Sequence, residues 1–379
     1  MTAYLDHAAT TPVCEEAAAA ALRVMTGGFG NPSAQYPLGR EAKKQLEADR
    51  KTVAAALGCQ PRELIFTSGG TEGDNWAIRV GAELGRHRGR HIITTAIEHD
   101  AVLQTCRRLE AEGWEVSYLP PTREGTVSLE DLKDALRPDT VLVSMMLVNN
   151  ELGTVLPVRE ATALVKSFDR RILFHTDAVQ GFLKLPFTPK GLGADLLTLS
   201  GHKVRAPKGI GALYIRSGLR WTPLLHGGGQ ENGLRSGTEP TAQIAAFAAA
   251  CAAGRAKLSE NAARMGALKE YALARLRARV PEAEPLVRGA APHILALTLP
   301  GYKSEVLVRV LGDRGVFVSA GSACHRGKAS HVYQAMGLSK PRRDGAFRVS
   351  FGPGTREEEI DALVSALAAA RDTLFPSMS

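Results

Sequence analysis

Seven short runs of apolar and β-branched residues lie between residues 60 and 216, and segments with helical spacing separate most of them. In residues 71–86, for example, Trp76, Val80 and Leu84 recur at intervals of four, which is the spacing of one helix face. Strands that alternate with helices predict an α/β fold with a mainly parallel sheet and helices on both of its faces. The seven expected strands are residues 63–68, 91–96, 114–119, 140–147, 171–176, 194–200 and 211–216.

The connection before the last of these strands differs from the others. It reads "GHKVRAPKGI" (residues 201–210), and Gly201, Pro207 and Gly209 leave no room for a crossover helix. Because two parallel strands need a long crossover, we expect the seventh strand to run antiparallel to its neighbour.

The chain after residue 216 has a different pattern. A glycine-rich loop (221–238) precedes an alanine-rich region (240–280) that predicts one long helix or a broken one. Short strands (293–299 and 347–351) and helices (304–314 and 356–374) then indicate a smaller α+β domain. We therefore predict a large domain over residues 15–255 and a small domain built from residues 1–14 and 256–379.

Composition excludes several classes of protein. The net charge of +8 is spread along the 379 residues, whereas nucleic-acid binding requires a clustered basic face. No apolar run approaches the roughly 20 residues that span a bilayer, and "MTAYLDHAATTP" lacks the pattern of a secretory signal. The five cysteines form no CxxC pair, which fits a reducing compartment. We expect a cytoplasmic protein with no nucleic-acid partner, no membrane contact and no metal site.

Polar side chains of different kinds follow five of the expected strands. Ligands of open α/β sheets bind beyond the carboxyl ends of the strands, so these residues should meet at one edge. Each alone has an ordinary structural explanation, such as a helix cap or a surface histidine, but five at one edge favour a binding site. The residues are Gly70 and Thr71, His99, Asn150, Asp177 and Gln180, and Ser200, His202 and Lys203.

Pyridoxal phosphate is a cofactor that would use all of these groups. Its aldehyde needs an amine for a Schiff base, for which Lys203 is the candidate, and its ring nitrogen needs a carboxylate such as Asp177. Its phosphate suits a helix N-terminus with small residues and hydroxyls. Gly70, Thr71, Ser200 and His202 are the candidates for that phosphate site. Dinucleotide-binding and P-loop folds are the rival explanations of an α/β sheet. The chain has neither a GxGxxG motif after the first strand nor a GxxxxGK[ST] motif.

Distinctive motifs occur along nearly the whole chain. They are "YLDHAATTP", "GNPSAQYPLGREA", "IFTSGGTEGDNWAI", "EHDAV", "VNNELGTVLPV", "HTDAVQ", "SGHKVRAPKGIGALY", "GGGQENGLRSGT", "SAGSAC" and "FRVSFG". Together these motifs resemble those of cysteine desulfurases of the iron–sulfur-cluster and nitrogen-fixation type, which are class V aminotransferases, a group of fold-type I pyridoxal-phosphate enzymes.

The resemblance implies a role for each matching residue. It makes Lys203 the Schiff-base lysine, His99 the imidazole stacked on the cofactor ring, and Asn150 and Gln180 further ring contacts, with Asn150 also near substrate. It makes Thr238 a contact to the cofactor phosphate of the other subunit, which implies a homodimer. Arg348 matches the arginine that holds the substrate carboxylate, a task suited to its bidentate fork.

Cys324, in "SAGSACHRGK", matches the nucleophile that takes sulfur from L-cysteine. Its basic neighbours His325, Arg326 and Lys328 would favour the thiolate. The resemblance implies that L-alanine is released and that sulfur passes from Cys324 to an acceptor protein. The segment after Cys324 lacks a few residues that housekeeping members of the family have, so the acceptor need not be the usual scaffold protein.

Two other activities of the same fold remain open at this point. An aminotransferase would not need Cys324, and a selenocysteine lyase would not require thiol attack. A protein that keeps the fold only to bind a partner would be expected to lose Lys203 or Asp177, and both are present.

Overall fold

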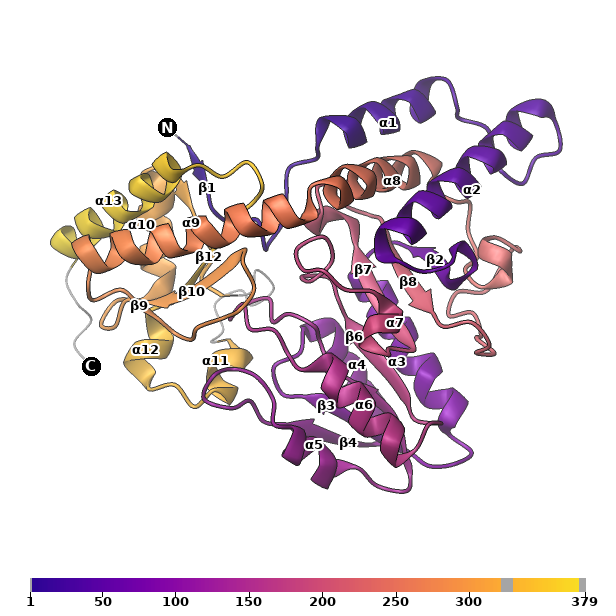
Figure 1. Cartoon of the computed structure of the whole chain (residues 1–379), viewed down its shortest axis with the longest axis horizontal. Coiled ribbons are helices and arrows are strands. Elements are labelled where there is room, and N and C mark those ends of the chain that lie inside the picture. Colours follow the sequence, from indigo (N-terminus) through magenta and orange to yellow (C-terminus); the bar gives the residue numbers. More distant parts are fainter. Residues whose placement is uncertain (1, 322–329, 375–379) are drawn as a thin grey trace.

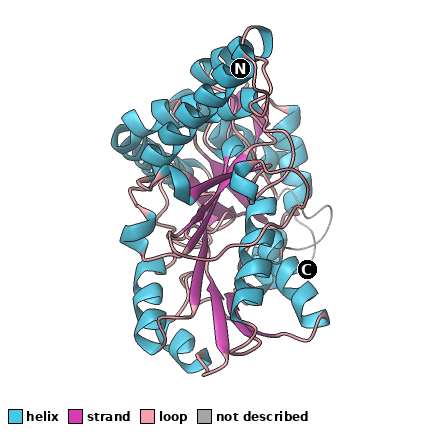
Figure 2. Cartoon of the chain, turned by 90° about the vertical axis from the view of Figure 1, so that its right-hand side faces the viewer, coloured by secondary structure: helices cyan, strands magenta, loops and turns pink. Residues whose placement is uncertain are grey.

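The computed structural model describes residues 2–321 and 330–374. Its central feature is a seven-stranded sheet in the order β2-β8-β7-β6-β5-β3-β4. Helices cover both faces of this sheet, which lies in the right half of the molecule in Figure 1 and is surrounded by helices in Figure 2. The predicted α/β fold with a mainly parallel seven-stranded sheet is therefore confirmed.

All seven predicted strands form, with bounds that differ from the predicted ones by up to three residues. They are β2 (Leu64–Thr67), β3 (His91–Thr95), β4 (Glu115–Leu119), β5 (Thr140–Ser144), β6 (Leu173–Asp177), β7 (Leu196–Ser200) and β8 (Gly211–Ile215). The helices that precede, separate and follow them are α1 (Glu15–Thr26), α2 (Pro37–Leu57), α3 (Gly70–Gly85), α4 (Asp100–Ala111), α5 (Leu129–Ala135), α6 (Val158–Phe168), α7 (Pro189–Leu192) and α8 (Thr241–Ala256).

The seventh strand of this sheet, β8, runs antiparallel to both of its neighbours, β7 and β2, as the short connection predicted. Gly211, the first residue of β8, lies against Gly69, where a Cβ atom would come within 2.7 Å of the Gly69 Cα atom. Gly69 has φ +152°, a conformation that suits glycine. The two glycines let β8 pack directly beside the turn from which α3 begins.

The remaining elements form a smaller α+β layer, at the left of Figure 1. The alanine-rich region is a broken helix, since α8 ends at Ala256 and α9 (Leu258–Arg279) begins after Lys257. The N-terminal strand β1 pairs with β11, which periodicity did not predict because each has only two residues. The other elements are β1 (Ala3–Tyr4), β9 (Glu284–Pro285), β10 (Ile294–Thr298), α10 (Ser304–Asp313), β11 (Val316–Phe317), α11 (His331–Ala335), α12 (Lys340–Asp344), β12 (Ala346–Ser350) and α13 (Glu357–Thr373).

Apolar side chains form three buried clusters. Leu64 and Phe66 belong to one cluster and Ile65 to another, because successive side chains of β2 point to opposite faces of the sheet. The third cluster lies among α9, α10, α13 and the small sheet.

The predicted bounds of the two domains stay a prediction. Within the described part of the chain, no helix is long and apolar enough to cross a membrane.

Candidate active site

A cavity of about 250 Å³ opens at the carboxyl ends of the central strands. It collects the polar groups that the sequence placed after five separate strands, together with Arg348 from β12. Ten of the predicted site residues line it: Gly70, Thr71, His99, Asn150, Asp177, Gln180, Ser200, His202, Lys203 and Arg348.

Lys203 ends a short 3-10 turn that directly follows β7. Its Nζ atom donates hydrogen bonds to the backbone carbonyls of Ala8 and Ala9, both at 2.7 Å. The N-terminal segment therefore closes one side of the cavity, and it also accepts a 2.9 Å bond from the Gln180 amide through Ala8. Sequence reasoning assigned no role to this segment, although its motif "YLDHAATTP" was one of those that matched the family.

The N-terminus of α3 supplies donors for an anion. No side chain caps this helix, so the first backbone N–H groups have no partner within it. A Cβ atom on Gly70 would come within 3.0 Å of Val179 and 3.7 Å of Ser200, so a side chain there would crowd this wall. Burial, with the positive charge of Lys203 adding, lowers the pKa of nearby His202 to about 4, and its imidazole is therefore neutral near pH 7.

His99 is held at the N-terminus of α4. Its Nδ1 atom accepts a 3.1 Å hydrogen bond from the backbone N–H of Ala101, which makes it the N-cap of the helix. In a neutral ring this acceptor role leaves the proton on Nε2. The ring lines the cavity together with Asp177.

Two buried carboxyl groups, Asp74 and Asp177, lie at the inner wall. Burial raises the pKa of both, and the charge of Asp177 raises that of Asp74 further, whereas His99 and Lys203 counteract the effect at Asp177. His175 does not neutralise Asp74, because burial lowers the pKa of this histidine to about 3. The pKa of Asp74 is therefore raised more than that of Asp177. Sequence patterns did not single out Asp74, since it reads as an ordinary polar residue of a helix.

Arg348 is 2 % exposed, and the structure fixes its guanidinium group from two sides. Nη1 donates to the backbone carbonyl of Asn150 at 2.7 Å, and Nη2 donates to Asp6 Oδ1 at 2.8 Å. Its Nε atom is buried without a hydrogen-bond partner among the described residues. The group is thus preorganised and retains donor capacity toward the cavity.

Cys324 lies outside the described residues, but the described residues that flank residues 322–329 are well anchored. Ser319, three positions from this segment, pairs with Arg348 in a β-bridge. On the other side, the Ser330 hydroxyl donates a 2.6 Å hydrogen bond to the buried Glu151. Both flanks therefore join elements that also carry cavity residues.

The other cysteines have none of the features of a reactive thiol. Cys14, Cys106 and Cys251 are buried, and burial raises the pKa of each. Burial also raises the pKa of the half-buried Cys59 to about 12. Thiolates are therefore disfavoured at all four positions.

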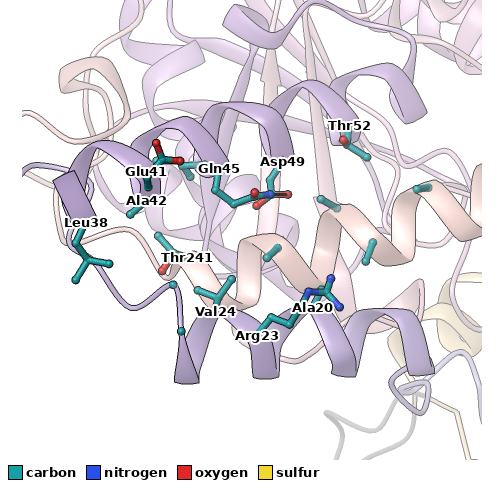
Figure 3. A pocket seen from close by; sticks show the side chains of 17 residues that line it. Ala20, Arg23, Val24, Leu38, Glu41, Ala42, Gln45, Asp49, Thr52 and Thr241 are labelled. Carbon is teal, nitrogen blue, oxygen red and sulfur yellow. Dashed lines mark hydrogen bonds between the residues drawn. The ribbon is translucent and has the colours of Figure 1, made fainter.

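Thr238 does not line the cavity; it is exposed and lies between a 3-10 turn (Glu231–Gly233) and α8. A second cavity of about 600 Å³ lies near this part of the chain, between α1, α2 and α8 (Figure 3). Its floor consists of alanines from α8, and its walls carry Arg23, Glu41 and Asp49. It has no lysine, histidine or cysteine, so the predicted chemistry belongs to the smaller cavity around Lys203.

The fold and the cavity together define an α/β enzyme with its site at the carboxyl ends of the strands. Known proteins that are similar to this chain support that description. The aminotransferase class-V family matches residues 3–363, and the chain belongs to this family. A protein of Methanosarcina thermophila named cysteine desulfurase IscS is 41 % identical over 367 residues, which cover 95 % of this chain and 90 % of that protein.

Two solved structures extend this likeness to three dimensions. One is described as a NifS-like protein, with a TM-score of 0.94, 37 % identity, and coverage of 99 % of this chain and 100 % of the other. Another is described as SspA in complex with cysteine, with a TM-score of 0.79, 35 % identity, and coverage of 93 % and 99 %.

Proposed function

We propose that this chain is a pyridoxal-phosphate-dependent cysteine desulfurase, which converts L-cysteine to L-alanine and retains the sulfur on Cys324. The observation that carries the proposal is the single cavity in which the Lys203 amine, the His99 imidazole, the Asp177 carboxyl and the N-terminus of α3 converge. The names of the relatives support the reaction, and the bound cysteine of the SspA structure supports the substrate.

The donor set fits the cofactor. The uncapped N-terminus of α3, with Gly70 and Thr71, suits a phosphate dianion, and Ser200 and neutral His202 add donors beside it. Asp177 would hold a proton on the ring nitrogen, and the raised pKa of Asp74 behind it disfavours a second buried negative charge. Pyridoxal phosphate, when bound, supplies an aldehyde that captures amines and a ring that withdraws electrons.

The reaction assigns a distinct task to each remaining residue. Arg348 and Asn150 bind and orient the substrate carboxylate, with the arginine held by Asp6. The Lys203 Nζ atom would take the proton from the substrate Cα atom. The Cys324 thiolate forms a bond to the substrate sulfur while the Cβ–S bond of the substrate breaks, which leaves a persulfide. His99 is the candidate acid for the proton that completes the alanine methyl group.

The proposal includes a homodimer in which Thr238 contacts the cofactor phosphate bound to the other subunit. Exposure of Thr238 supports this, because the residue is available to a partner. Large apolar side chains on and between α1 and α2 are also exposed, which is typical of surfaces covered in an assembly. They include Leu22 (61 % exposed), Met25 (60 %) and Phe29 (67 %).

The persulfide would pass to an acceptor protein for iron–sulfur clusters or thiolated cofactors. A reducing compartment such as the cytoplasm suits a mechanism that begins with a free thiolate at Cys324. The acceptor is defined by its chemistry, which is a nucleophilic thiol able to attack the outer sulfur.

The test is turnover of L-cysteine by the cofactor-loaded protein in the presence of a thiol reductant. We expect L-alanine and sulfide in equal amounts, with no requirement for a keto acid. Lys203→Ala should lose turnover together with the visible absorbance of the Schiff base. An aminotransferase would instead require a keto acid and release no sulfide. A selenocysteine lyase would turn over L-selenocysteine far faster than L-cysteine.

A further inference from the structure

A separate cavity of about 350 Å³ lies where loops after β6 and β7 meet the start of α1, the α8–α9 junction and the segment after β12. It shares no lining residue with the cavity around Lys203. Its most unusual feature is Lys184, which follows β6 in the sequence "GFLKLP".

Lys184 is 5 % exposed, and its backbone N–H donates to the Gly181 carbonyl at 3.0 Å, yet its side-chain amine has no hydrogen bond or ion pair with any described residue. Burial lowers the pKa of His7 and of His293, and the charge of Lys184 lowers both further. Burial, with the charge of Arg205 adding, lowers the pKa of Lys184 itself to about 8. A buried ammonium group without a counter-charge is strongly disfavoured, so an anion beside Lys184 would stabilise its charged form.

The cavity rim also carries an excess of positive charge. Arg205, Lys257 and Arg264 line it with Lys184, against the two carboxylates Glu16 and Glu260. Arg205 and Leu183, the residue before Lys184, both have positive φ values, of 68° and 55°. This conformation is unfavourable for residues with side chains, so the fold holds both loops in strained positions around the cavity.

We propose that this cavity binds a small anion with phosphate or carboxylate oxygens, with Lys184 as the ligand at its inner wall and Arg205 and Arg264 at the rim. The site differs from the cradle proposed for the cofactor phosphate, and it does not depend on the desulfurase reaction.

A bound anion would connect two groups of elements. Cys14, Leu183 and Val204 belong to the hydrophobic cluster of the central sheet, whereas α9 contributes Met265 to the cluster of the smaller layer. Arg264, on α9, already donates a 3.0 Å hydrogen bond to the Thr355 carbonyl after β12. An anion held by Lys184 and Arg264 therefore ties these two layers together and stabilises the folded protein.

The experiment is thermal unfolding and calorimetric titration of the cofactor-loaded protein with inorganic phosphate, citrate or acetate. Ionic strength is held constant with sodium chloride, so that only an anion preferred over chloride registers. We expect a saturable rise in Tm with phosphate or with a carboxylate, and the more effective probe identifies the chemistry that is recognised. Lys184→Met should weaken binding about tenfold or more, because a charged hydrogen bond is lost.

Two further variants test whether the response to anions comes from this cavity. Lys190→Met removes an exposed lysine of nearby α7 and should bind the anion like the wild type. Arg264→Gln should weaken binding even if Lys184→Met changes the stability of the fold. The proposal is overturned if no probe gives a saturable response, or if Lys184→Met responds like the wild type. It is also overturned if Ser200→Ala, in the proposed cofactor cradle, abolishes the response while Lys184→Met does not.

Discussion

The Arg348 guanidinium donates from Nη2 to Asp6 Oδ1 at 2.8 Å, across 342 positions of the sequence. This ion pair joins β12 to the N-terminal segment, whose carbonyls at Ala8 and Ala9 accept from Lys203. Asp6 therefore positions the group that we propose to hold the substrate carboxylate, and the same segment positions the lysine that acts on the substrate.

We expect Asp6→Asn to raise KM for L-cysteine about tenfold with a smaller change in kcat, because one charge-assisted hydrogen bond to Arg348 becomes a neutral one. Arg348→Lys should raise KM more, since lysine cannot form the bidentate fork. Steady-state rates over a range of L-cysteine concentrations measure both effects. An unchanged KM in Arg348→Lys would argue against its proposed role.

Thr238 allows a test of shared sites by mixing subunits. Thr238→Ala should weaken the cofactor site of the other subunit, and Lys203→Ala should inactivate its own. A mixed dimer then carries one site with both changes and one site with neither. We expect activity at limiting cofactor to rise when the two variants are unfolded and refolded together. No gain over the two separate proteins would mean that Thr238 serves its own subunit or no site.

The burial of Glu98 should make the free energy of unfolding depend on pH. It is buried, one of its oxygens has no partner among the described residues, and burial raises its pKa to about 8. Between its unfolded value of about 4.3 and this value, the folded protein binds the extra proton, so stability falls as pH rises.

The free energy of unfolding of Glu98→Gln, relative to wild type, should therefore increase by about 1 kcal/mol per pH unit between about pH 5 and about pH 8. Denaturation in urea at several pH values measures the difference. Glu160→Gln, which removes an exposed carboxylate of α6, is the matched control. A difference that does not vary with pH would show that Glu98 is ionised in the folded protein.

The buried pair of Arg50 and Glu231 predicts a large effect on stability. Both guanidinium Nη atoms donate to the carboxylate at 2.7 Å, and Glu231 also accepts from the Phe66 backbone N–H at 2.9 Å. Glu231→Gln should cost about 3–5 kcal/mol, because it removes the buried counter-charge of Arg50 and leaves only the more exposed Glu47, 3.4 Å from Arg50 Nε.

An exposed ion pair provides the comparison for this variant. Asp139→Asn removes one of the two carboxylate partners of Arg137 on the surface, the other being Glu115, and it should cost under about 1 kcal/mol. Chemical denaturation measures both variants. Equal losses would mean that burial does not govern the contribution of Glu231.

The central sheet could be predicted because each of its strands corresponds to a short continuous run of apolar and β-branched residues. Seven β-branched runs gave all seven strands, and the short connection after Ser200 gave the antiparallel direction of β8. The two-residue strand β1 was not predictable, since so short a segment has no period and depends on pairing with distant β11. The break at Lys257 was left open because alanine-rich sequence favours helix on both sides of it.

The candidate site also includes residues that could be predicted from the sequence and residues that could not. Residues directly after strands, such as His99 and Asp177, were found from their place in the pattern, and they line the cavity. Asp74 and Asp6 were missed, because their importance comes from neighbours that are distant in sequence. Lys184 was missed for a further reason: a lysine ordinarily predicts an exposed position, and only the fold reveals that this one is buried.

The most direct test of the central claim is mass spectrometry of the cofactor-loaded protein after reaction with L-cysteine without reductant. We predict one additional sulfur atom on the peptide that contains Cys324 and none on peptides with Cys14, Cys59, Cys106 or Cys251. Cys324→Ala should keep the visible absorbance of the cofactor and acquire no sulfur. Release of alanine without added sulfur on Cys324, or undiminished sulfide release by Cys324→Ala, would contradict the proposed mechanism.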